Sequence, residues 1–240
     1  MGTFLVFACI ILIASILQTS TGFGFSILAT PFLLMLFLPQ DAIQINIILS
    51  IIISVSFIWR IKKDIDITLL KRFTLGSIAG VPLGIFIFMS IDIDAFKLGI
   101  SILLLIVTLL LIFNLKIKAT PFGDFIVGGI SGLLTTSIGM PGPPLLLYFT
   151  GTDTEKSKLR ATTLAFYLFI YTISLITQIS FTSTSLLIWK SSLYAIPIVF
   201  LGMYLGQIVF KWFTQRMFQI FTYILLSCTA IYLLIQSLAG

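Results

Sequence analysis

The stretch "STGFGFSILATPF", residues 20–32, places two glycines, hydroxyl side chains and a proline inside an apolar segment that spans residues 4–38. A second stretch, "TSIGMPGPPLLLYF", residues 136–149, interrupts the apolar segment 122–150 in the same way. Glycine and proline are the residues least compatible with an uninterrupted helix. Each of the two segments is therefore predicted to contain a break between two shorter helices.

The composition assigns the chain to a structural class. Hydrophobic residues make up 59% of the 240 residues and charged residues only 9%, whereas a soluble domain carries far more charge. Several apolar runs reach the roughly 20 residues that a membrane-spanning helix needs. We therefore expect an all-α polytopic membrane protein. Its apolar segments lie at 4–38, 42–59, 73–90, 96–114, 122–150, 161–179, 193–210 and 217–236.

Residues that are absent or isolated exclude several functions. The chain has no histidine, and the predicted span interiors hold no Asp or Glu, which argues against an intramembrane enzyme. Cys9 and Cys228 both lie in apolar runs and form neither a disulfide framework nor a metal-binding pattern. We predict no catalytic residues, no metal site and no cofactor. The net charge of +6 is attributed to cytoplasmic loops rather than to nucleic-acid binding.

The distribution of basic residues favours one topology. If each broken segment enters and leaves the membrane on one side, or crosses it twice, twelve of the 14 basic residues share a face and only Lys97 and Lys190 lie opposite. If each crosses once, the division is eight to six. Because Lys and Arg accumulate in cytoplasmic loops, the first arrangement is predicted, with both termini outside.

Short matches between the two halves indicate an internal repeat. Gly22 and Gly139 open the two breaks and are 117 residues apart, and "GVPLG" at 80–84 precedes "GMYLG" at 202–206 by 122 residues. With three further crossings after each break, the second half is inverted in the membrane. The predicted fold is two inverted repeats, residues 1–118 and 119–240, each a broken or re-entrant helix pair followed by three transmembrane helices, an architecture typical of transporters. The glycines of the G-x-x-x-G pairs, and of "GGISG" at 128–132, are interpreted as helix-packing residues.

The breaks predict an anion site. We expect one helix to end around Gln18–Thr21 and the next to begin after Gly24, and in the second half the prolines at 143–144 begin the new helix. Each second half-helix then directs its free N–H groups and positive dipole end at the middle of the membrane. Hydroxyls gather there, either as helix caps or as ligands, and the adjacent carbonyls leave a Na⁺ site open as an alternative. The predicted substrate-binding residues are Thr19, Ser20, Thr21, Gly22, Gly24, Ser26, Asn46, Thr136, Ser137, Gly139, Met140, Gly142 and Arg160.

Five stretches carry a family resemblance: "TGFGFSILATPFLLMLF" (21–37), "WRIKKDID" (59–66), "GVPLG" (80–84), "GMPGPPLLLYF" (139–149) and "LRATTLAF" (159–166). In this order they resemble the TauE/SafE family, which is associated with passage of sulfite and organosulfonate anions across bacterial inner membranes. The family's glycine-rich motif recurs once per half. Phe25 and Pro141 depart from it, since many members carry glycine at these places. The resemblance supports an anion transporter more strongly than sulfite itself.

Three polar residues near the breaks have two interpretations each. Arg160 either attracts or gates a departing anion or anchors the helix at the cytoplasmic face. Asn46 and Gln178 are interpreted chiefly as interhelical hydrogen-bonding residues, with Asn46 retained as a candidate ligand.

These observations predict a secondary transporter, an exporter, that moves a small anion such as sulfite or an organosulfonate across the bacterial inner membrane. An anion channel with the same site and an ion-coupled anion importer remain alternatives. The expected partners are the anion and membrane lipid, without nucleic acid. The sequence leaves open the identity of the anion, the coupling ion and whether two copies form a homodimer.

Overall fold

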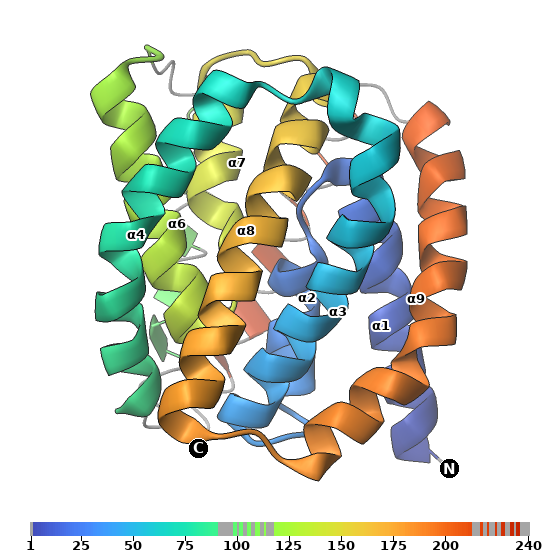
Figure 1. The fold of residues 1–240 in the computed structure, drawn as a ribbon. Helices are drawn as coiled ribbons and strands as arrows, with labels where there is room; N and C mark the ends of the chain where they lie inside the picture. Colours follow the sequence, from blue (N-terminus) through green and yellow to red (C-terminus); the bar gives the residue numbers. More distant parts are fainter. Residues whose placement is uncertain are drawn as a thin grey trace.

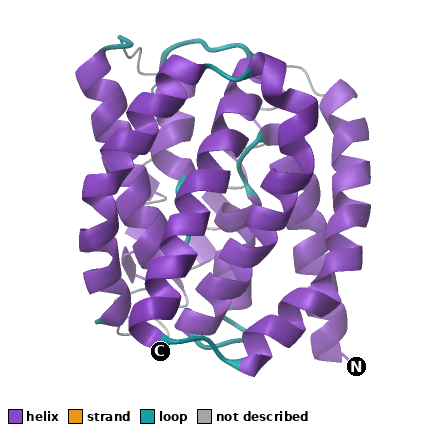
Figure 2. Ribbon diagram, viewed as in Figure 1, coloured by secondary structure: helices purple, strands orange, loops and turns teal. Residues whose placement is uncertain are grey.

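The computed structural model describes residues 2–90 and 118–212 continuously, with scattered positions between 98 and 113 and between 217 and 235. All regular structure in this described part is helical (Figures 1 and 2), which confirms the all-α prediction. The elements are α1 (Gly2–Thr21), α2 (Phe25–Leu33), α3 (Pro39–Ile61), a 3₁₀ turn (Lys62–Asp64), α4 (Ile67–Met89), α6 (Pro121–Ile138), α7 (Gly142–Gly151), α8 (Lys156–Thr182) and α9 (Leu186–Trp212).

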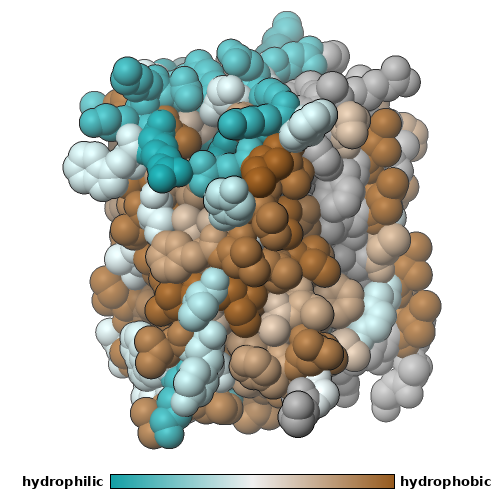
Figure 3. All heavy atoms as spheres, turned by 90° about the vertical axis from the view of Figure 1, so that its right-hand side faces the viewer, coloured by the Kyte–Doolittle hydropathy of each residue, from teal (hydrophilic) through white to brown (hydrophobic). Residues whose placement is uncertain are grey.

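The outer surface is suited to lipid. Five helices in the described residues, α1, α3, α4, α8 and α9, are long and apolar enough to cross a membrane. Large apolar side chains point outward from them; Trp59 and Phe86, for example, are 75% and 71% exposed. Figure 3 shows hydrophobic residues over the middle of one face and hydrophilic residues gathered at the end that is uppermost in Figure 1. The chain is a polytopic membrane protein, as predicted.

The helices are longer than the predicted apolar segments. The segments predicted at 161–179 and 193–210 correspond to α8 and α9, which begin five and seven residues earlier and end three and two residues later. Helical hydrogen bonding continues through polar residues at the membrane surface, whereas an apolar run stops at them. The predicted segments 96–114 and 217–236 lie outside the continuously described residues.

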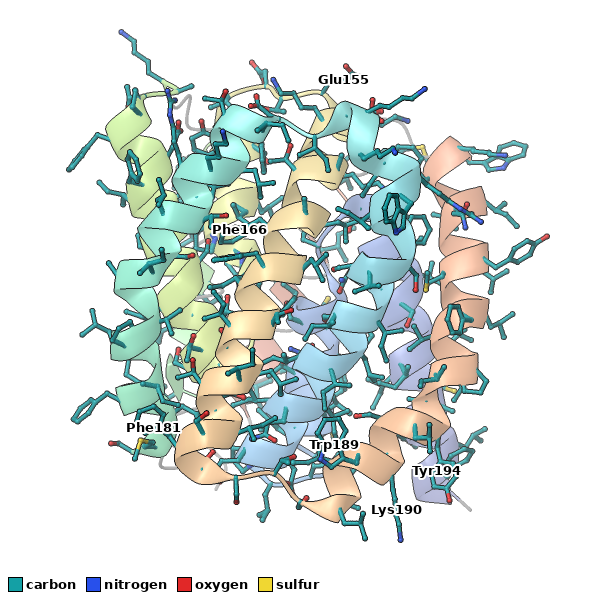
Figure 4. All side chains as sticks on the ribbon, viewed as in Figure 1. Glu155, Phe166, Phe181, Trp189, Lys190 and Tyr194 are labelled. Atoms are coloured by element: carbon teal, nitrogen blue, oxygen red, sulfur yellow. The ribbon has the colours of Figure 1, made fainter. Side chains whose placement is uncertain are left out.

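Connections that carry basic residues meet at one end of the bundle. The ammonium of Lys158, near the start of α8, lies 2.7 Å from a carboxylate oxygen of Asp66, just before α4. Figure 4 labels Glu155 at this end and Lys190 at the opposite end. The α3–α4 connection and the start of α8 therefore share one face, and Lys190 lies on the other.

Two helix pairs run into the bundle and turn back. In Figure 1, α1 and α3 begin at the lower end, so α1 and α2 together enter and leave there. Helices α6 and α8 begin at the upper end, so α6 and α7 enter and leave from that side. The two turns lie inside the bundle rather than at its surface, since residues 22–24 and 139–141 are buried.

Glycines bring α4 into backbone contact with α6. A Cβ atom at Gly84 would lie 2.6 Å from the carbonyl oxygen of Leu133 and 2.8 Å from the Cβ of Thr136. A Cβ at Gly80 would lie 2.6 Å from the backbone nitrogen of Leu133. The stretch at 128–132 lies in the same interface. Side chains do not fit here, which confirms the packing interpretation of these glycines.

Helix α9 packs on α1 in the same manner. A Cβ at Gly202 would lie 2.5 Å from the Cβ of Ser15. At Gly206 it would lie 2.7 Å from both the carbonyl oxygen of Ile16 and the Cβ of Thr19. Both G-x-x-x-G pairs therefore let one helix of each half lie directly against a helix of the other half.

Candidate functional site

The first break is a glycine turn between α1 and α2. Helix α1 ends at Thr21, Gly22 and Gly24 have φ angles of 88° and 124°, and α2 begins at Phe25. Glycine adopts such angles without the steric cost that a Cβ imposes. No side chain caps the start of α2. The predicted helix boundaries are thus confirmed.

The second break combines a left-handed glycine with prolines. Gly139 has a φ of 71° and ends α6, with its N–H donated to the carbonyl of Thr135. Helix α7 begins at Gly142 and has proline in its first turn, which confirms the helix-starting prediction for Pro143 and Pro144. Gly142 does not have a positive φ, so its backbone conformation does not itself require a glycine. A glycine is required at this position because neighbouring residues approach it too closely for a side chain.

That approach brings the two breaks together. A Cβ at Gly142 would lie 2.9 Å from the hydroxyl oxygen of Tyr167, 3.4 Å from the Cδ1 of Ile27 and 3.6 Å from the Cβ of Phe23. The first residue of α7 therefore lies against the first turn of α2 and the turn before it. The positive dipole ends of both half-helices lie side by side within the bundle.

The two half-helices offer different numbers of N–H donors. The first hydrogen bond to the start of α2 is donated by Leu28 to Gly24, so the N–H groups of residues 25–27 remain free of intrahelical bonds. In α7, Pro143 and Pro144 have no N–H, which leaves Gly142 as the donor in that turn. The prediction treated the two ends as equivalent, but prolines that start a helix well also remove its donors.

Three of the six predicted hydroxyls donate to carbonyls of their own helices. Ser20 and Thr21 donate to the carbonyl of Leu17 at 3.1 and 2.6 Å, and Ser137 donates to that of Leu133 at 2.8 Å. A hydroxyl that donates locally presents only lone pairs to its surroundings, which repel an anion. For these residues the structure favours the local interpretation.

The remaining predicted hydroxyls differ in the groups that surround them. Thr136 pairs with Ser174 of α8 at 2.7 Å, and the side chain of Thr19 lies at the α1–α9 interface beside Gly206. Ser26, in the first turn of α2, is 1% exposed and its hydroxyl has no hydrogen-bond partner among the described residues. Of the hydroxyls predicted from sequence, Ser26 is the one that stays free at a half-helix start.

Two amides stabilise the end of α6. Asn46 donates from Nδ2 to the carbonyl oxygen of Gly139, and Gln178 donates from Nε2 to that of Thr136, both at 2.8 Å. These carbonyls lose helical partners where α6 stops. The interhelical interpretation is confirmed for both amides, and the side-chain oxygen of Asn46 has no partner in the described structure.

Arg160 lies beside the first break. A Cβ at Gly22 would lie 2.7 Å from the Cα of Arg160, about 6 Å along α8 from its first residue. The residue is 7% exposed, and its guanidinium lies over the rings of Phe57 and Phe210, 5.2 and 4.2 Å from their centroids. Its Nε has no hydrogen-bond partner among the described residues. The side chain is therefore enclosed by aromatic rings rather than exposed to solvent.

Met140 contributes packing rather than polar chemistry. It is fully buried within a hydrophobic cluster that includes Phe23 and Tyr167, and its N–H is donated to the carbonyl of Leu134 at 3.2 Å. In the described residues no three His, Cys, Asp or Glu side chains come together.

Sequence reasoning missed two tyrosines of α8. Tyr167 and Tyr171 are fully buried, their rings meet edge to face with centroids 5.1 Å apart, and neither hydroxyl has a hydrogen-bond partner among the described residues. The hydroxyl of Tyr171 lies close to those of Ser26 and Ser50. The available signal was the spacing of four residues, which places both rings on one helix face.

A buried carboxylate holds α7 against its neighbours. Asp124 is 1% exposed; one carboxylate oxygen lies 2.9 Å from the guanidinium of Arg72 in α4, and the other accepts a 2.6 Å hydrogen bond from Tyr148 in α7. Asp124 lies in the first turn of α6 and is enclosed rather than solvated. It joins α4, α6 and α7.

The fold and the site define a class of protein. It is a multi-spanning helical membrane protein with two interrupted helices, and the N-terminal ends of the half-helices that follow the interruptions, α2 and α7, meet inside the bundle. The sequence model of the family described as Sulfite exporter TauE/SafE matches residues 7–233. The chain belongs to the TauE/SafE family, a family of membrane transporters that export sulfite, and the suspected resemblance is confirmed. No curated protein and no solved structure matched the chain in the same comparisons.

Proposed function

We propose that this protein is a secondary transporter that exports a small oxyanion, such as sulfite or an organosulfonate, through the site where α2 and α7 begin. The observation that carries the proposal is the contact of Gly142 with Ile27 and Phe23. It places two positive dipole ends side by side among apolar side chains, where an anion is the favoured ligand. Family membership supports an anion as the cargo.

We further propose that residues 1–118 and 119–240 are inverted repeats with re-entrant breaks. The contacts of the interface glycines support this. Gly84 lies against Thr136, and Gly206 lies against Thr19. The two threonines are 117 residues apart, as are Gly22 and Gly139. If the two halves have opposite orientations and are related by a two-fold axis, a glycine of each half packs against the equivalent threonine of the other half.

The proposed orientation places the basic end in the cytoplasm of a bacterial cell and the start of α1 outside. Lys158 and its neighbours on α8 lie at the basic end, and positive residues favour the cytoplasmic side. In the inner membrane, the first break would then lie nearer the cytoplasm, beside Arg160. This residue is proposed to attract the anion as it enters.

The proposed driving force is the membrane potential. One elementary charge moving through 100 mV is worth about 2.3 kcal/mol, so a divalent anion leaving a cell at about 150 mV gains roughly 7 kcal/mol. The site fits a potential-driven mechanism, since the groups that meet at the breaks are N–H groups, hydroxyls and amides, with Arg160 beside the first break. Asp, Glu and His, which relay protons in many transporters, are not among the described residues there.

The proposal is tested by efflux from proteoliposomes loaded with sulfite. A K⁺/valinomycin potential, inside negative, is expected to accelerate efflux without a pH gradient. The control is Gly142→Leu, whose side chain would fill the space against Tyr167 and Ile27 while the protein still inserts. Efflux that follows a pH or Na⁺ gradient instead would establish the ion-coupled alternative, and single-channel currents would establish the channel. Absence of anion movement in every arm would refute the proposed function.

A further inference from the structure

The hydroxyls of two buried tyrosines at the breaks have no hydrogen-bond partner by geometry in the described structure. Those of Tyr167 and Tyr171 are enclosed in the bundle and fully buried. A buried polar group without a partner costs about 1–3 kcal/mol. Such groups in native proteins call for an explanation, and a ligand that accepts their hydrogen bonds supplies one.

Each tyrosine faces a different half-helix. The hydroxyl oxygen of Tyr167 lies 2.9 Å from the Cβ position of Gly142, the first residue of α7. The hydroxyl of Tyr171 lies near Ser26, the second residue of α2, whose own hydroxyl is also unpartnered. A single face of α8 therefore directs one phenol at each positive helix end.

The rings are held in place by packing. They meet edge to face at an interplanar angle of 66°, and both belong to the hydrophobic cluster that contains Phe23 and Ile27. A phenol has few rotatable bonds, so a packed ring fixes the position of its hydroxyl oxygen. Two fixed donors match a ligand with two separate acceptor oxygens.

We propose that Tyr167 and Tyr171 are specificity-determining residues that donate hydrogen bonds to two oxygens of one bound oxyanion. The helix ends attract any small anion, and the phenols favour those with several oxygens, such as sulfite or a sulfonate, over a halide. Phenols add donors without adding charge, so selectivity is gained without trapping the anion electrostatically. This inference rests on the proposed function of the same site.

The test compares Tyr167→Phe and Tyr171→Phe with the wild type in purified full-length protein. Each change removes one oxygen and preserves the ring. The matched control is Tyr204→Phe, since Tyr204 is 64% exposed on α9. Affinities for sulfite, methanesulfonate and bromide are measured by calorimetry, and melting curves verify that each variant is folded.

Each phenylalanine variant at the site is expected to lose about 10- to 100-fold in affinity for sulfite and methanesulfonate, as for a hydrogen bond to a charged group. Bromide affinity and the control stay near the wild-type values. Unchanged oxyanion affinity in both variants, or an equal loss for bromide, overturns the inference while leaving the transporter proposal intact. A wild-type protein that binds none of the three anions refutes the proposed function itself.

Discussion

Gly22→Ala should disrupt the first break, the turn between α1 and α2. The new Cβ would lie 2.7 Å from the Cα of Arg160. An ordinary carbon contact begins near 3.4 Å, so the hairpin or α8 must move by about 0.7 Å, the difference between these distances. The obstructing atom is helix backbone, which cannot rotate away.

Two costs add at this position. A left-handed conformation costs an L-residue roughly 1–2 kcal/mol, and overpacking a filled site costs roughly 1–3 kcal/mol. We therefore expect the free energy of unfolding to fall by roughly 2–5 kcal/mol. Displacing the start of α2 from α7 should also slow transport.

The assay is unfolding in mixed micelles, followed by circular dichroism, together with sulfite efflux from proteoliposomes. Gly129→Ala is the matched control, because its Cβ would meet nothing closer than 3.4 Å and its backbone is helical. That variant should be unchanged or up to about 1 kcal/mol more stable, since alanine favours helices. Wild-type stability and efflux in Gly22→Ala would refute the reasoning.

Three further changes test other parts of the structure. Asp124→Asn should lower the free energy of unfolding by about 1.5–3 kcal/mol by removing a charge-assisted contact with Arg72, measured by the same unfolding assay. An unaffected protein would show that this pair does not stabilise the contact between α4 and α6. Burial raises the pKa of Asp66, but the Lys158 ammonium and a backbone N–H outweigh it, and the pKa lies below its ordinary value of 3.8. A lowered carboxyl pKa stabilises the fold above the unfolded pKa, so the stability difference between wild type and Asp66→Asn should be constant at neutral pH. It should disappear as the pH falls through the folded pKa, and a difference that grows on acidification would contradict this assignment. A cysteine introduced at Glu155, in a background without native cysteines, should react with impermeant reagents only from the cytoplasmic side; labelling from outside intact cells would reverse the proposed orientation.

The positions of the breaks follow from the sequence because their causes are local. Gly22 and Gly139 take left-handed φ angles, and proline within a helix is favoured in the first turn. The packing role of the G-x-x-x-G pairs is likewise predictable, since small residues at that spacing form a flat strip on any helix. The ion pair and the hydrogen bond of Asp124 were not predicted, since its partners Arg72 and Tyr148 come from two other helices.

The sequence by itself determined the class, the two interruptions and their anion-favouring helix ends, because composition, periodicity and backbone preference act over a few residues. Only the tertiary structure decided which polar groups face the breaks. Ser20 and Ser137 return their hydroxyls to their own helices, whereas Tyr167 and Tyr171 reach the starts of α7 and α2. That outcome depends on the rotation and depth of α8 against the breaks. Those are set by packing among helices distant in sequence, which no local pattern encodes.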